Sequence, residues 1–162
     1  MICIKQVDRD VILPLVSSLC QKDNPSFYYL KEGGDFIGTI HVAYFSDDNQ
    51  VVGCLSMSIS AKRHFDVIPQ YKIDGIAVKE NFRGQGIGLA LVKMAEFVAL
   101  NNEVRCVWLY KTPQSEKYFL KQGFEIFKPS TDESQILVKY PEEHCCSSCE
   151  SCKQNSVCNK KH

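Results

Sequence analysis

The stretch NFRGQGIGLAL, residues 81–91, constrains the fold of this chain more than any other, because it sets three glycines on alternate positions between a strand pattern and a helix pattern. Before it, the alternation in YKIDGIAV, residues 71–78, predicts a strand. After it, apolar residues recur at helical spacing from about residue 86 to residue 101. The glycines therefore form a turn through which a strand enters a helix, and the first amides of that helix have no partner inside it.

The rest of the chain alternates between strand and helix patterns. Asp10 is a candidate N-cap for a helix with Pro14 in its first turn, where the missing amide costs nothing. The turn-rich SDDNQ joins two apolar stretches and predicts a hairpin. Further strands are expected at residues 2–7, 36–45, 51–60, 104–110, 123–127 and 134–140, and further helices at residues 23–34 and after Pro113.

Composition excludes several classes of protein. A chain of 162 residues that is 44% hydrophobic and 23% charged fits one globular domain. Lysine plus arginine equals aspartate plus glutamate, at 19 each, so we expect neither nucleic acid nor an anionic membrane as a partner. No segment approaches the ~18 apolar residues of a membrane helix, and no leader pattern is present, so we expect a cytoplasmic protein. Four scattered cysteines are interpreted as reduced core residues: Cys3, Cys20, Cys54 and Cys106.

The glycine turn does not match two well-known phosphate-binding loops. A dinucleotide-binding fingerprint that starts at Gly84 needs a third glycine at the position of Leu89. A P-loop needs lysine and a hydroxyl residue after its last glycine, and Gly88 is followed by leucine. What remains is a strand reading IAV, then R-x-x-G-x-G, then a helix. A second motif, TPQSEKYFLKQGF, occupies residues 112–124.

These two motifs resemble those of the GNAT superfamily of acyl-CoA-dependent N-acyltransferases, over roughly residues 1–140. The resemblance implies an α/β (α+β) fold with a mixed, mostly antiparallel central sheet of about six or seven strands and about four flanking helices. It also implies an acetyl-CoA-dependent N-acetyltransferase that moves an acetyl group to a primary amine, either a small amine such as a polyamine or a protein amine, by direct attack in a ternary complex. The sequence leaves the oligomeric state open between a monomer and a homodimer.

By the same resemblance, the pantetheine arm pairs with the backbone of Ile76, Ala77 and Val78. The pyrophosphate lies on the glycine turn, where amides at the positive end of a helix face it. A β-carbon on any of the three glycines is expected to stand between amide and phosphate oxygen. Arg83 either contacts the cofactor or supports the loop. The cofactor-binding residues of the turn are Arg83, Gly84, Gln85, Gly86, Ile87, Gly88 and Leu89.

The expected catalytic residues depart from the family pattern. The tyrosine that usually protonates the leaving thiolate is replaced by Phe119, which leaves Tyr118 as the candidate acid or as a packed aromatic residue. Members of the family that lack this tyrosine use a glutamate on the central strand. The aligned residue here is Lys72, which cannot replace that carboxylic acid. Asp74 is the candidate base and amine-binding carboxylate, with a plain polar strand residue as the alternative. His41 and His64 are further candidate bases, but a histidine on a strand or in a loop is more often a satisfied or solvated residue.

Two regions leave alternatives open. Phe27 and Tyr28 fall in the early helical region that lines the amine-acceptor site in the superfamily. They either bind the substrate or belong to the core. The tail, residues 141–162, is cysteine-rich and fits a disordered segment, a zinc site or redox chemistry. We assign no metal ligand. Besides an active transferase, the sequence allows a coenzyme A-binding module without catalysis, or a metal-binding or redox protein that works through its tail.

Overall fold

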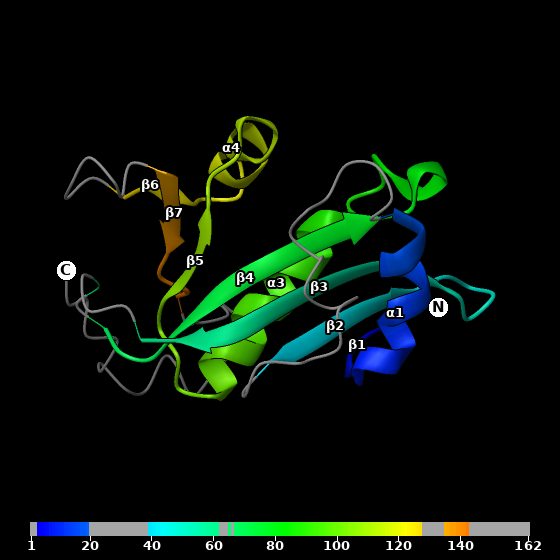
Figure 1. The fold of residues 1–162 in the computed structure, drawn as a ribbon, viewed down its shortest axis with the longest axis horizontal. Coiled ribbons are helices and arrows are strands. Elements are labelled where there is room, and N and C mark those ends of the chain that lie inside the picture. Colours follow the sequence, from blue (N-terminus) through cyan, green and yellow to red (C-terminus); the bar gives the residue numbers. More distant parts are fainter. Residues whose placement is uncertain (1–2, 20–38, 62–64, 66, 128–134, 143–162) are drawn as a thin grey trace, which may run out of the picture.

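The computed structural model describes residues 3–19, 39–61, 65, 67–127 and 135–142. Figure 1 shows the order of its elements along the chain. The strands are β1 (Cys3–Val7), β2 (Ile40–Phe45), β3 (Val51–Ser60), β4 (Gln70–Val78), β5 (Val107–Tyr110), β6 (Glu125–Ile126) and β7 (Ile136–Lys139). The helices are α1 (Arg9–Leu19), the 3-10 turn η2 (Glu80–Phe82), α3 (Ile87–Asn101) and α4 (Pro113–Leu120).

The strands form one seven-stranded sheet in the order β1-β2-β3-β4-β5-β7-β6. Every neighbouring pair is antiparallel except β4 and β5, which are parallel. The parallel pair needs a crossover, and α3 supplies it between the two strands. The predicted mixed, mostly antiparallel sheet and the hairpin of β2 and β3 are therefore confirmed.

Helices cover both faces of the sheet, as Figure 1 shows. On one face the apolar stripe of α3, including Leu91 and Ala95, packs on Leu55 and Met57 of β3. On the other face, Ile12, Leu15 and Val16 of α1 pack with Cys54 of β3 and Ala77 of β4. Because side chains alternate along a strand, neighbouring residues of β3 serve opposite layers. The α1 face of the sheet is also the face that carries the candidate site.

Some expectations about these layers were wrong. Helix α1 begins at Arg9, so Asp10 lies inside its first turn and Pro14 lies beyond that turn. The described residues contain three of the roughly four helices expected. The helix expected at residues 23–34 lies outside the described residues, as does the tail from residue 143.

The scattered cysteines differ in their environments. Cys54 and Cys106 are fully buried, as expected of core residues. Burial raises the pKa of the Cys106 thiol to about 12, so the group stays protonated and unreactive at neutral pH. Cys3 is exposed, so its assignment to the core was wrong: it lies on the edge strand β1. Among the described residues, no helix is long and apolar enough to span a membrane.

Candidate functional site

The parallel strands β4 and β5 pair over a very short distance. Their register contains only Tyr71 with Val107 and Lys72 with Trp108. Beyond those pairs the two strands diverge, as Figure 1 shows. The half of β4 that runs toward Val78 therefore forms an edge beside β5, and it leads directly into the glycine turn.

The glycine turn links β4 to α3 through two backbone conformations that favour glycine. Gly84 has φ 76° and Gly86 has φ 80°, and Gly86 is the N-cap of α3. A β-carbon built on either residue meets no atom within 4 Å. The turn is thus held by conformation rather than by packing, and the space beside it is open. The first amides of α3 adjoin that space, since a helix leaves them without internal partners.

Arg83 supports this loop. Its Nε donates a hydrogen bond to the carbonyl of Val78 at 3.0 Å, which ties the turn to the end of β4. Gln85 adds a longer contact from Nε2 to the carbonyl of Asn81 at 3.5 Å. Arg83 thus makes a contact that suits a supporting residue, and its contact with the cofactor stays a prediction.

The third glycine of the turn has a neighbour that its sequence position did not indicate. A β-carbon on Gly88 would collide with the hydroxyl oxygen of Tyr118 on α4. Glycine at this position therefore makes room for a tyrosine, rather than for a phosphate oxygen alone. Burial raises the pKa of the Tyr118 hydroxyl, and a hydrogen bond with the Gln122 side chain lowers it by less. The hydroxyl thus stays protonated at neutral pH and remains a donor.

Phe119 and Tyr118 face different surroundings although they are adjacent in sequence. Phe119 is buried and makes an edge-to-face contact with Phe124, with ring centroids 5.1 Å apart. Tyr118 is partly exposed and lies edge-on to Phe119 at 5.2 Å. Consecutive residues on a helix lie about 100° apart, so one ring enters the core while the other reaches α3.

Asp74 occupies an irregular position in β4. The register pairs Ser56 with Gly75 and Met57 with Ile73, so Asp74 is the extra residue of a β-bulge. Its side chain is only 5% exposed, and its Oδ1 lies 3.4 Å from the Nζ of Lys72. Its Oδ2 is buried and has no hydrogen-bond partner among the described residues. This burial contradicts the alternative of a plain polar residue on a wet edge.

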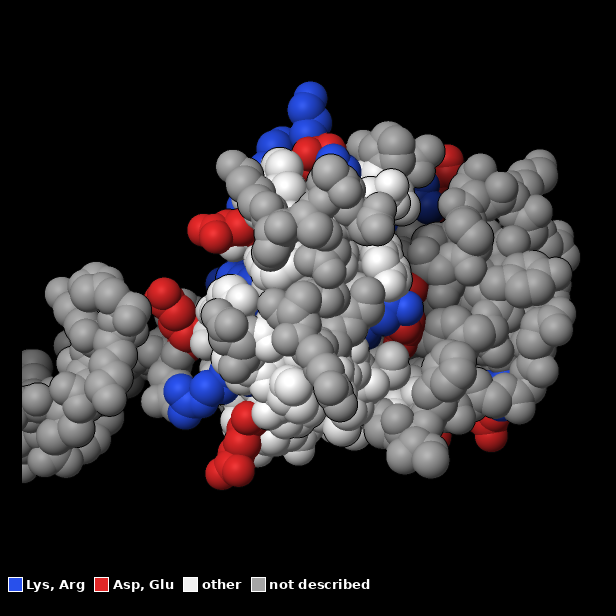
Figure 2. All heavy atoms as spheres, turned by 60° about the vertical axis from the view of Figure 1, so that its left-hand side comes forward, with Lys and Arg blue, Asp and Glu red and all other residues white. Residues whose placement is uncertain are grey.

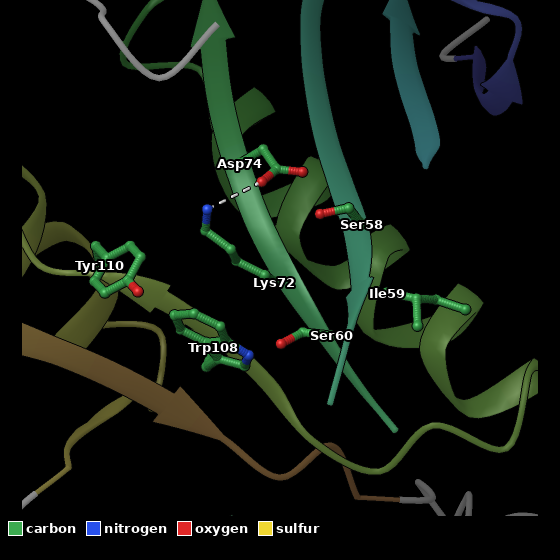
Figure 3. A pocket seen from close by; sticks show the side chains of 7 residues that line it. All are labelled: Ser58, Ile59, Ser60, Lys72, Asp74, Trp108 and Tyr110. Atoms are coloured by element: carbon green, nitrogen blue, oxygen red, sulfur yellow. Dashed lines mark ion pairs between the residues drawn. The ribbon is translucent and has the colours of Figure 1, made fainter. Parts of the chain in front are cut away.

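An open hollow of about 320 Å³ surrounds this carboxylate. Figure 3 shows Asp74 and Lys72 on β4 turned toward each other, with the rings of Trp108 and Tyr110 beside the lysine. The Nζ of Lys72 lies 5.2 Å from the ring centroid of Tyr110 and 5.9 Å from that of Trp108. The residues that line the hollow are Ser58, Ile59, Ser60, Lys72, Asp74, Trp108 and Tyr110.

The two candidate catalytic residues lie in different parts of the site. Asp74 lines the hollow, whereas Tyr118 lies against Gly88 of the glycine turn. His41 is 3% exposed, and its Nδ1 lies 2.8 Å from the hydroxyl oxygen of Ser56, so it is a buried and satisfied residue. Phe27, Tyr28 and His64 lie outside the described residues.

Most of the hollow was not anticipated from the sequence. Ser58 and Ser60 on β3, and Trp108 and Tyr110 on β5, each stand two positions apart. That spacing puts each pair on one face of its strand, which was a usable signal. For Lys72 the sequence indicated only that it cannot replace the family's glutamate. Its spacing from Asp74 also indicates that the two side chains share a face of β4.

No metal site is evident around these residues. Among the described residues no group of three or more histidine, cysteine, aspartate or glutamate side chains is placed to hold a metal ion. The cysteines of the tail lie outside that part of the chain. Figure 2 shows acidic and basic side chains interspersed over the described part of one face.

The chain matches the model of the acetyltransferase (GNAT) family over residues 6–124. No curated protein matches it. It is similar to the solved aminoglycoside antibiotic 6'-N-acetyltransferase AAC(6')-Ih from Acinetobacter baumannii, with a TM-score of 0.64 and 16% identity over 81% of this chain and 95% of that chain.

Two further solved structures share the fold. The GNAT family N-acetyltransferase YhbS from Escherichia coli, in complex with CoA, has a TM-score of 0.64 and 20% identity over 88% of this chain and 81% of that chain. A putative acetyltransferase from Exiguobacterium sp. 255-15 has a TM-score of 0.64 and 21% identity over 86% of this chain and 93% of that chain.

The contact between Gly88 and Tyr118 predicts that Gly88→Ala changes the free energy of unfolding in opposite directions with and without the tyrosine. Gly88→Ala should destabilise the protein, because the new methyl group displaces the Tyr118 ring. In a Tyr118→Ala background the same change should stabilise it by about 0.5–1 kcal/mol, as replacement of glycine by alanine inside a helix does. Urea unfolding of the four proteins measures both effects. The same sign in both backgrounds would contradict the contact.

Proposed function

The chain belongs to the acetyltransferase (GNAT) family, and from that premise we propose that it moves an acetyl group from acetyl-CoA to a primary amine by direct attack. The observation that carries the proposal is the glycine turn. Two glycines at positive φ, with open space beside them, stand at the N-terminus of α3. That combination suits an anion that approaches the backbone closely.

The turn and the edge of β4 together fit coenzyme A. Amides of Ile87, Gly88 and Leu89 in the first turn of α3 would hold the pyrophosphate, with a helix N-terminus adding about 0.3–1 kcal/mol. Ile76, Ala77 and Val78, on the part of β4 beyond its pairing with β5, would bond the pantetheine arm through their backbone. The CoA bound to the related YhbS supports the same class of donor.

The reaction exchanges a carbon–sulfur bond for a carbon–nitrogen bond. The neutral amine nitrogen attacks the thioester carbonyl carbon, and the carbon–sulfur bond then breaks to release coenzyme A as a thiolate. The nitrogen, positively charged after the attack, loses a proton to solvent, and the thiolate takes one up. The carbonyl oxygen needs a donor while it carries negative charge. In our proposal the backbone amide near Ile76 supplies that donor, at the edge of β4 beside the hollow.

Asp74 suits the role of base. An alkylamine arrives protonated, since its pKa is near 10.4, and must lose a proton before it attacks. We propose the Asp74 carboxylate as the acceptor of that proton; its Oδ2 is buried and has no hydrogen-bond partner among the described residues. The hollow around it, about 320 Å³, has room for a small acceptor.

Tyr118 suits the return of a proton to the thiolate. Its hydroxyl lies at the start of α3, beside the amides proposed to hold the donor, and its raised pKa keeps it protonated. A thiolate with a pKa near 8.5 also takes a proton from solvent, so Tyr118 is not indispensable in this scheme. Asp74 and Tyr118 thus serve the two ends of the reaction.

The glycine turn predicts that Gly86→Ala weakens acetyl-CoA binding. Alanine at φ 80° costs about 1–2 kcal/mol of backbone strain, and its methyl group enters the space proposed for the phosphate. Gly123, at φ 87°, is a matched control because alanine there suffers similar strain and only ordinary contact with Lys139.

Calorimetric titration of coenzyme A into both variants separates strain from ligand contact. Both should lose similar thermal stability, whereas only Gly86→Ala should lose at least about tenfold in affinity, which corresponds to ~1.4 kcal/mol. Equal affinities of the two variants would remove the glycine turn from the proposed cofactor site.

The proposed base predicts that Asp74→Asn lowers turnover at neutral pH by about a hundredfold, with a small effect on the affinity for acetyl-CoA. Asp48→Asn, which removes an exposed carboxylate from the β2–β3 turn, is the control and should act like the parent. The measurement is thiol release from acetyl-CoA against a panel of amines. Full turnover by Asp74→Asn at every pH tested would show that Asp74 is not the base.

A further inference from the structure

Lys72 occupies the centre of the hollow, where the ammonium group of a cationic acceptor would otherwise stand. Its Nζ lies 3.4 Å from Oδ1 of Asp74 and within about 6 Å of two aromatic rings. A carboxylate and two aromatic rings are the surroundings that favour an ammonium ion. The chain thus supplies its own cation to this position.

The ion pair leaves binding capacity unused on both partners. Its 3.4 Å separation is longer than the 2.7–2.9 Å of a charge-assisted hydrogen bond, so the donors of Lys72 are not committed to Asp74. The Oδ2 of Asp74 is buried with no hydrogen-bond partner among the described residues. The ammonium group of Lys72, whose side chain is 33% exposed, is therefore the part of the pair most open to a ligand in the hollow.

The charges that the described lining residues bring to the hollow cancel. Lys72 and Asp74 are the only ionisable groups of opposite sign among its lining residues, which otherwise contribute hydroxyl groups, an indole and an isoleucine. A site without net charge has no electrostatic preference for an acceptor with several positive charges. It does complement a molecule that carries one positive and one negative group close together.

We propose that Lys72 determines acceptor specificity by pairing with a carboxylate that stands next to the reacting amine, so that the acceptor is an amino acid. This inference rests on the proposed function and names the substrate class of that site. The acceptor's carboxylate takes the uncommitted donors of Lys72, and its amine lies beside the Lys72–Asp74 pair. Tyr110, which is 48% exposed, offers apolar surface to a side chain of the acceptor.

The test compares acceptors that differ only in the carboxylate. Phenylalanine, phenylalaninamide and phenethylamine share one side chain, and the dipeptide Phe-Asp carries its nearest acidic group farther from the amine. The parent protein should favour phenylalanine over its amide by about ten- to a hundredfold in kcat/KM. Lys72→Met should abolish that preference, and Lys72→Arg should keep part of it.

Lys5→Met is the matched control, because Lys5 also lies over an aromatic ring, that of Phe45, but on β1. It should leave the preference unchanged. Equal use of phenylalanine and its amide by the parent, or an equal loss for all acceptors in Lys72→Met, would overturn the role of Lys72. Preference for Phe-Asp over phenylalanine would overturn the amino acid and assign a peptide as the acceptor.

A binding measurement separates this inference from the proposed function. Trp108 is the single tryptophan of the chain and lines the hollow, so tryptophan emission reports ligands there. Phenylalanine should change the emission of the parent but not that of Lys72→Met. That result without any thiol release would defeat the proposed acetyl transfer and retain the binding role of Lys72. Thiol release with other amines, and no change in emission with phenylalanine, would retain the proposed acetyl transfer and defeat the binding role of Lys72.

Discussion

The short pairing of β4 with β5 is the constraint on which the candidate site depends. Two parallel strands that bond only at Tyr71–Val107 and Lys72–Trp108 must diverge afterwards. That divergence leaves the end of β4 as an edge beside β5 and aims it into the glycine turn. It also sets Trp108 and Tyr110 of β5 opposite Lys72 and Asp74 of β4, around one hollow. The proposed acetyl-CoA site and the proposed amine site thus both result from the divergence of β4 and β5 after only two residue pairs.

Local irregularities then place individual groups at this edge. A β-bulge sets Asp74 out of register with β3, which leaves a nearly buried carboxylate with one oxygen free of partners among the described residues. Two positive φ angles turn the chain so that the first amides of α3 adjoin open space. The contact of Tyr118 with Gly88 links α4 to the same helix end. Each irregularity costs some backbone stability and supplies a group that regular structure would not.

The sequence predicted the parts of this arrangement that depend on local pattern. The glycine turn, α3 and the hairpin of β2 and β3 followed from glycine spacing and apolar periodicity, which act over a few residues. The start of α1 was misplaced because two aspartates, Asp8 and Asp10, compete for the cap. The hollow was missed because it combines β3, β4 and β5, and no local pattern tells which strands become neighbours. The role of Gly88 depends on Tyr118, thirty residues away, and was missed for the same reason.

The central claim is that an acyl-CoA binds along the end of β4 and across the N-terminus of α3. Amide hydrogen exchange of the full chain, with and without coenzyme A, tests this most directly, because it reports on backbone groups at both places. The account predicts that added coenzyme A slows exchange at residues 76–78 and 84–89, and leaves the β1–β2 edge of the sheet unchanged. Protection confined to other segments, or no change at the glycine turn under saturating ligand, would contradict it.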